Sequence, residues 1–183
     1  MAYALGVRSF AENRVQEAEQ KAAELADLDV EWSIIGPLQR NKAKDVARFG
    51  AELQTLDSVR LATQLDRRLG QEGRTIRALI QVNTSREDQK SGVDPADVPE
   101  LIEQLQQFEH IKLTGFMTMA MFDAPDEDVR ACFRELRELQ TELVRTYPNM
   151  TELSMGMSGD YHLAIEEGAT IVRIGSAIFG TRD

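Results

Sequence analysis

Short apolar runs of strand-like composition alternate with helical patterns along the chain. We expect seven strands, at residues 7–10, 30–35, 52–56, 75–82, 111–117, 151–155 and 170–174. The clearest helix is predicted for residues 126–147, where apolar positions such as Val129, Phe133 and Leu136 recur at helical spacing. A second helix is expected to start at Asp97, three residues before Glu100 in capping-box spacing. This alternation predicts an α/β fold with a parallel sheet.

The number of strands indicates a barrel that lacks its first part in this chain. A parallel barrel of the TIM type, (β/α)8, contains eight strands. Residues 2–6 have the pattern of the last turn of a helix that ends at a C-cap glycine, Gly6. We therefore expect one domain, residues 1–183, that forms a (β/α)8 TIM-type barrel without its first strand and most of its first helix.

Charge and composition restrict the partners. The net charge of −10 argues against nucleic acid or an anionic membrane as a partner through the bulk electrostatic field. No apolar run approaches the roughly 20 residues that span a bilayer, so we expect a cytoplasmic protein. The single Cys132 is expected to be a buried, inert thiol. His110 and His162 form no metal-ligand pattern with it, and no metal is predicted.

Two successive strand-to-helix loops near the end of the chain have the composition of a phosphate site. Ser158 follows the sixth predicted strand, and Gly175 and Ser176 follow the seventh. Small residues before a helix direct backbone N–H groups and the positive end of the helix dipole at one volume. In parallel α/β barrels, a phosphate often binds to the loops after the last two strands. Alone, Ser158 would equally suit the N-cap of the following helix.

Arg173 is the strongest candidate for a second ligand contact. It lies between Val172 and Ile174 on a predicted strand, so it points into the barrel if those two residues face the helices. A guanidinium there requires an acceptor, either a carboxylate from another strand or a ligand beside the phosphate loop.

Two further segments are compatible with a binding role. Asn13 stands at the rim of the predicted barrel, or else caps the helix that follows. The charged loop at residues 83–93 could act as a lid or be simply solvated.

These motifs together resemble the pyridoxal phosphate homeostasis protein family. The resemblance extends over the whole chain and rests on residues 10–17, 32–42, 81–83 with Lys90 and Gly92, 153–158 and 172–180. The domain of this family is similar to the barrel half of alanine racemase, the third fold type of pyridoxal phosphate proteins. The resemblance implies pyridoxal 5′-phosphate as the cofactor.

For the phosphate, the resemblance implies that Ser158, Gly175 and Ser176 hold it. For the ring, it implies that Arg173 faces the pyridine nitrogen, that Asn13 lies near the ring hydroxyl and that Met155 lines the ring face. A guanidinium donates to the ring nitrogen but does not protonate it, so the ring becomes a weak electron sink. Storage and delivery of the cofactor are therefore favoured over turnover.

The sequence departs from the family pattern at three places. Ser33 replaces the usual histidine and Ala11 the usual glycine. In the family, the lysine that forms the Schiff base lies on the first strand, ahead of the segment equivalent to Ala2, and we identify no catalytic residue in this chain. None of its lysines is expected at a strand end of that kind: Lys21, Lys42, Lys44, Lys90 and Lys112.

The sequence thus predicts a non-catalytic protein of vitamin B6 homeostasis that binds pyridoxal phosphate. Pyridoxal phosphate-requiring apo-enzymes are the expected protein partners, and the expected oligomeric state is a monomer or weak homodimer. Two alternatives are a pyridoxal phosphate-dependent amino-acid racemase and a barrel enzyme acting on a phosphorylated metabolite. Either would require an acid and base pair that we do not identify here.

Overall fold

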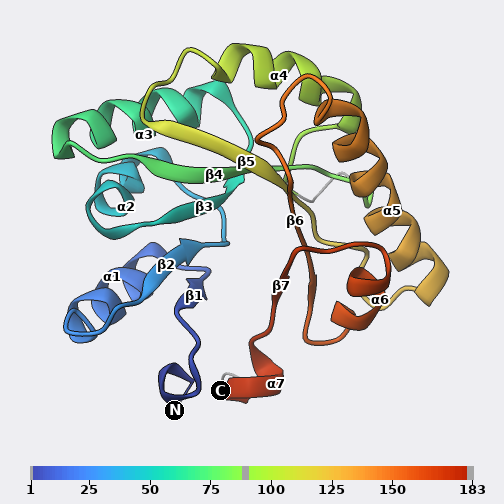
Figure 1. The fold of residues 1–183 in the computed structure, drawn as a ribbon, viewed down its shortest axis with the longest axis horizontal. Helices are drawn as coiled ribbons and strands as arrows, with labels where there is room; N and C mark the ends of the chain where they lie inside the picture. Colours follow the sequence, from blue (N-terminus) through green and yellow to red (C-terminus); the bar gives the residue numbers. More distant parts are fainter. Residues whose placement is uncertain (1, 88–90, 181–183) are drawn as a thin grey trace. The chain divides into compact units, whose positions relative to one another are not determined.

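The computed structural model describes residues 2–87 and 91–180. All seven predicted strands are present and follow one another in chain order within one sheet (Figure 1). The pairs β1–β2, β2–β3, β5–β6 and β6–β7 are parallel, as predicted. The strands are β1 (Ser9–Glu12), β2 (Glu31–Ile34), β3 (Glu52–Leu56), β4 (Ile76–Gln81), β5 (Ile111–Met117), β6 (Glu152–Met157) and β7 (Ile171–Arg173).

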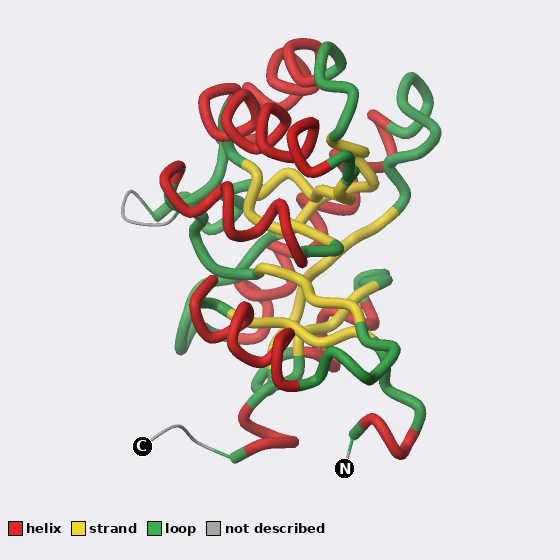
Figure 2. Tube along the Cα trace, turned by 90° about the vertical axis from the view of Figure 1, so that its left-hand side faces the viewer, coloured by secondary structure: helices red, strands yellow, loops and turns green. Residues whose placement is uncertain are grey.

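Helical segments separate the strands, and the first and last of them are short (Figure 2). In the part of the chain up to β4 they are η1 (Tyr3–Leu5), α1 (Val15–Glu24), η2 (Arg40–Lys42), α2 (Ala43–Phe49) and α3 (Val59–Glu72). After β4 they are η3 (Pro95–Asp97), α4 (Val98–Leu105), α5 (Asp126–Leu143), α6 (Tyr161–Glu166) and α7 (Ser176–Phe179).

Two helix boundaries differ from the sequence predictions. Helix α5 begins at Asp126 as predicted but ends at Leu143, four residues early. Helix α4 begins at Val98, one residue after the predicted start at Asp97, and is preceded by the 3-10 turn Pro95–Asp97, whose N-cap Asp94 accepts from the Ala96 N–H. The capping box of Asp97 and Glu100 stays a prediction. At the start of the chain, Gly6 is the expected C-cap, with a left-handed φ of 93°.

The chain divides into two compact units. The first contains residues up to Ala78 together with Leu101–Lys112, and the second contains Leu79–Glu100 and the residues from Leu113 onward. The boundary passes through β4 and β5. The expectation of one domain stays a prediction.

In the first unit, α2 and α3 pack on each other beside a buried strand. Leu61, Leu65 and Leu69 recur every four residues on α3 and are buried, which fixes the face that this helix turns inward. The helix starts where the Ser58 hydroxyl accepts from the Leu61 N–H and ends at Gly73. Strand β3 is buried along its full length, although it carries polar Glu52 and Gln54.

Neighbouring side chains satisfy the polar groups of β3. The Ser33 hydroxyl donates to Glu52 over 3.0 Å, and the Gln54 amide donates to the same carboxylate oxygen over 2.5 Å. Arg77 adds an ion pair with Glu31 at 2.7 Å. Ser33, one of the departures from the family pattern, is therefore part of a buried hydrogen-bond network.

In the second unit, α5 and α6 pack on each other and on β6 (Figure 1). The predicted apolar stripe of α5 is confirmed, because Val129, Phe133 and Leu136 are buried. Cys132 lies in the same stripe with 2% of its surface exposed, as expected for a buried thiol. Within the described residues, no helix is long and apolar enough to cross a bilayer.

We expect the substitution Gly36→Ala to destabilise the fold. A β-carbon at Gly36 would lie 2.1 Å from the Asn13 carbonyl oxygen, so the backbone of one loop must shift. Overpacking of this kind costs about 1–3 kcal/mol. The check is the midpoint of urea unfolding, with Gly159→Ala as control because no atom lies within 4 Å of that position. Equal midpoints for the two variants would contradict the expectation.

Candidate functional site

The loops after β6 and β7 meet in the second unit, as the sequence predicts. The Ser158 hydroxyl oxygen accepts hydrogen bonds from the backbone N–H groups of Gly175, at 3.2 Å, and Ala177, at 3.3 Å. Space is open at Gly159 and Gly175, where an added β-carbon would meet nothing within 4 Å. The backbone donors of Gly175 and Ala177 thus converge on the half-buried Ser158 hydroxyl, next to the open space at Gly159 and Gly175.

The N-cap interpretation of Ser158 is wrong. The cap position of α6 belongs to Asp160, whose carboxylate accepts from the Met157 N–H over 2.6 Å. This bond closes the loop after β6 and leaves Ser158 directed at the loop after β7.

Helices α6 and α7, which follow the two loops, are short. They contain six and four residues. A macrodipole grows from the summed peptide units, so helices of this length contribute little beyond the N–H groups of their first turns. The attraction for an anion in this loop therefore comes mainly from individual N–H donors.

Arg173 is held by neutral acceptors from two neighbouring strands. Its guanidinium donates from one terminal nitrogen to the Ser154 hydroxyl over 2.6 Å and from the other to the Thr118 carbonyl oxygen over 2.8 Å. Between described residues, no ion pair joins Arg173 to a carboxylate. The alternative of an internal ion pair is therefore not what the structure shows.

Burial lowers the pKa of Arg173 from its ordinary value to about 10, while the charge of Asp160 acts in the opposite direction. The guanidinium is thus protonated at neutral pH, and the fold bears the cost of its desolvation below pH 10. Because the unfolded chain binds the proton more tightly, that cost declines as the pH rises from about 10 toward the ordinary pKa of arginine.

A chain of hydroxyl groups supports the acceptors of Arg173. Thr118 is fully buried, and its hydroxyl donates to the Val82 carbonyl oxygen over 2.8 Å and lies 2.9 Å from the Thr84 hydroxyl. Sequence reasoning missed Ser154, Thr118 and Thr84. The only sequence feature that could have indicated these residues is a hydroxyl side chain on the inward face at the end of a strand.

Two further predicted ring contacts are Met155 and Asn13. Met155 is completely buried, and strand alternation places it on the face opposite Ser154. Met157, at 42% exposed, is the methionine of β6 that solvent reaches. Asn13 is exposed and follows β1 in the first unit. The contacts of Met155 and Asn13 with a cofactor ring stay predictions.

The loop at 83–93 is tied down at both ends, and Lys90 lies outside the described residues. Val82 and Val93 form a bridge, and the Asn83 N–H donates to the Val93 carbonyl oxygen over 2.8 Å. Arg86 forms an ion pair with Glu135 of α5 at 2.6 Å. Movement of this loop as a lid stays a prediction.

Histidines and acidic residues do not gather into a metal site. His110 instead contacts Asp66, with its N–H and its ring both on the same carboxylate oxygen, at 2.8 and 3.1 Å. Residues 2–87 and 91–180 contain no group of three or more potential metal ligands.

A family match and a similar solved structure define the class of protein to which this chain belongs. The family described as alanine racemase, N-terminal domain, matches residues 1–183. Alanine racemase of Clostridium difficile 630 has the same fold, with a TM-score of 0.79 at 17% identity over 96% of this chain and 46% of that chain. The chain belongs to the alanine racemase N-terminal domain family, and the predicted α/β barrel class is confirmed.

Nearer relatives define the particular family. The pyridoxal phosphate homeostasis protein of Aquifex aeolicus is 44% identical over 98% of this chain and 79% of its own length. The pyridoxal phosphate homeostasis protein of Vibrio cholerae is 43% identical over 97% of this chain and 77% of its own length. PipY of Synechococcus elongatus PCC7942 superposes with a TM-score of 0.92 without pyridoxal phosphate, at 42% identity over 98% of this chain and 85% of that chain. The structure of PipY with pyridoxal phosphate bound superposes with a TM-score of 0.89, at 41% identity over 98% of this chain and 84% of that chain. Within its class, this chain belongs to the pyridoxal phosphate homeostasis proteins, as the sequence motifs predict.

We expect Ser154→Ala to lower stability by about 1–3 kcal/mol, because it leaves a charged donor of Arg173 without its buried acceptor. Urea unfolding measures the loss. Ser9→Ala, at an exposed position of β1, is the control and is expected to have little effect. A loss no larger than that of the control would show that Arg173 does not depend on this hydroxyl.

Proposed function

We propose that this chain binds pyridoxal 5′-phosphate in the second unit and acts in the homeostasis of this cofactor without a catalytic cycle of its own. The observation that carries the proposal is the convergence of the Ser158 hydroxyl with the N–H groups of Gly175 and Ala177, beside a protonated Arg173. The names of the relatives and the PipY complex support the choice of cofactor.

The residues present fit a phosphate monoester. The Ser158 hydroxyl accepts two N–H bonds and keeps its own proton to donate to a phosphate oxygen. Gly175 has open space on the side where a β-carbon would stand, so a phosphate oxygen can approach the backbone there. Ser176 follows directly and begins α7, where the first N–H groups lack partners within the helix.

The residues also fit an uncharged ring nitrogen. A guanidinium has five N–H donors, and the bonds to Ser154 and Thr118 use two of them. Arg173 has further donors for a ligand, and it remains charged at neutral pH. When bound, pyridoxal phosphate would supply an electrophilic aldehyde and an electron-accepting ring, and a donor without a transferable proton keeps that ring a weak electron sink.

This donor set supports the function of a carrier. Arg173 orients the ligand without exchanging a proton with it, and the Ser158 loop binds the phosphate through neutral donors. We propose that apo-enzymes requiring pyridoxal phosphate receive the cofactor, that the protein acts in the cytoplasm, and that it does so as a monomer or weak homodimer. The predicted contributions of Asn13 and Met155 to ring binding belong to the same proposal.

We expect Ser158→Ala to weaken pyridoxal phosphate binding by about tenfold to a hundredfold. The substitution removes one charge-assisted hydrogen bond to the phosphate, a contribution of about 1.5–3 kcal/mol. Absorbance titration with pyridoxal phosphate and with pyridoxal measures the effect. The variant should lose affinity for the phosphorylated form only, and Ser9→Ala should match the unchanged chain. Equal loss for both vitamers, or no binding by the unchanged chain, would overturn the phosphate assignment.

Borohydride treatment in the presence of pyridoxal phosphate should leave no stoichiometric pyridoxyl group on the lysines of this chain. The four lysines among the described residues all lie in the first unit, where Lys21 pairs with Glu12 and Lys42 lies 3.7 Å from Asp45. Lys44 and Lys112 are exposed. Peptide mass spectrometry provides the measurement, and free lysine treated alike gives the background. One defined lysine carrying the group at full occupancy would contradict binding through phosphate and ring contacts alone.

A further inference from the structure

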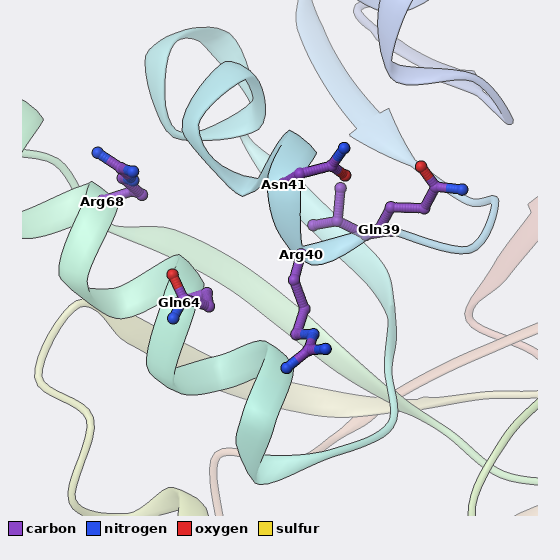
Figure 3. Close-up of a pocket in the computed structure, with 6 residues that line it drawn as sticks. Gln39, Arg40, Asn41, Gln64 and Arg68 are labelled. Carbon is purple, nitrogen blue, oxygen red and sulfur yellow. The ribbon is translucent and has the colours of Figure 1, made fainter.

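A basic depression opens in the first unit, and none of the residues that line it belongs to the phosphate loop. It has a volume of about 670 Å³ and is lined by Leu38, Gln39, Arg40, Asn41, Gln64 and Arg68. Figure 3 shows Arg40 extending from η2 alongside α3, with Gln64 and Arg68 on successive turns of that helix. The amides of Gln39 and Asn41 project from the η2 side. The volume is in the range of small-molecule sites, about 300–1,000 Å³.

The lining supplies two cations and no carboxylate. Arg68 donates to the neutral Gln71 amide oxygen over 3.0 Å. In the described parts of the chain, neither Arg40 nor Arg68 forms an ion pair. Other arginines, such as Arg77 and Arg130, contact carboxylates at 2.7 and 2.5 Å. The two guanidinium groups of the depression thus keep their charge available to a ligand.

The amides of the lining add hydrogen-bond donors. The Gln64 amide oxygen accepts a hydrogen bond from Arg67 over 3.2 Å. The amide nitrogen of Gln64 is then the polar atom of this side chain that can donate to a ligand. Gln39 and Asn41 are exposed and each carries two further N–H donors. The depression therefore combines charged and neutral donors.

The local charge opposes that of the whole chain. Residues 38–74 carry eight Lys and Arg against five Asp and Glu, a net of +3, whereas the chain has a net charge of −10. The segment that supplies the lining is therefore basic within an acidic chain.

We propose that this depression binds a small phosphorylated molecule carrying more than one anionic oxygen, such as a diphosphate. Planar guanidinium groups match phosphate oxygens through paired N–H donors. Leu38 is the only apolar side chain in the lining, and no aromatic ring is present on which a nucleobase could stack. The site takes the phosphate portion of its ligand, and its residues are independent of the loop that carries the proposed function.

The test is a titration of the full chain with inorganic diphosphate at low ionic strength, followed by calorimetry. Saturable binding is expected, and the double variant Arg40→Gln/Arg68→Gln should weaken it at least tenfold. The matched control Arg60→Gln/Arg145→Gln removes the same charge from exposed positions outside the lining and should change the dissociation constant less than twofold. Urea unfolding confirms that both double variants are folded.

Two further variants separate this site from the phosphate loop and from a loss of folding. Ser158→Ala should leave diphosphate binding unchanged, and Arg40→Lys/Arg68→Lys should weaken it while preserving the charge. The proposal is overturned by absence of saturable binding, by equal weakening in both glutamine variants, or by loss of binding in Ser158→Ala alone. The last result would assign diphosphate to the loop after β7.

Discussion

A charged guanidinium enclosed at the end of a short strand is the constraint on which the second unit depends. Arg173 requires hydrogen-bond acceptors there, because a desolvated cation without any acceptor destabilises a fold by several kcal/mol. The structure supplies a buried hydroxyl from β6 and a carbonyl from the residue after β5. Both acceptors are neutral, so the hydrogen bonds are satisfied while the charge remains uncompensated by a carboxylate.

This arrangement explains why so many hydroxyl side chains lie in the same region. Thr118 holds its own position through Val82 and Thr84, which keeps the carbonyl that faces Arg173 in place. Strands β4 to β7 of the second unit are thereby linked through one polar network. A substitution in the network affects the geometry of Arg173 even where the substituted residue contacts no ligand.

The strands could be predicted well because the residue types that favour a strand lie within the strand itself. The observed bounds of β3 and β5, for example, match the predicted ones. Ser158 and Gly175 were also recognisable, because phosphate loops depend on small residues at fixed places after a strand. The acceptors of Arg173 were not, since Ser154 and Thr118 meet it only through strand pairing, and a hydroxyl in a strand has no distinctive local pattern. The start of α4 lies within one residue of the predicted one, and the 3-10 turn Pro95–Asp97 in front of it accounts for the difference.

The hydroxyl of Ser158 has one consequence for how a bound anion would leave. In this structure the side chain itself occupies the acceptor position for the amides of Gly175 and Ala177. A departing phosphate therefore leaves neither backbone donor unpaired, because both remain bonded to the serine oxygen. Because the serine oxygen keeps both donors paired, the free-energy difference between the ligand-bound and ligand-free forms is smaller. A small difference of this kind favours release of a bound ligand over its retention.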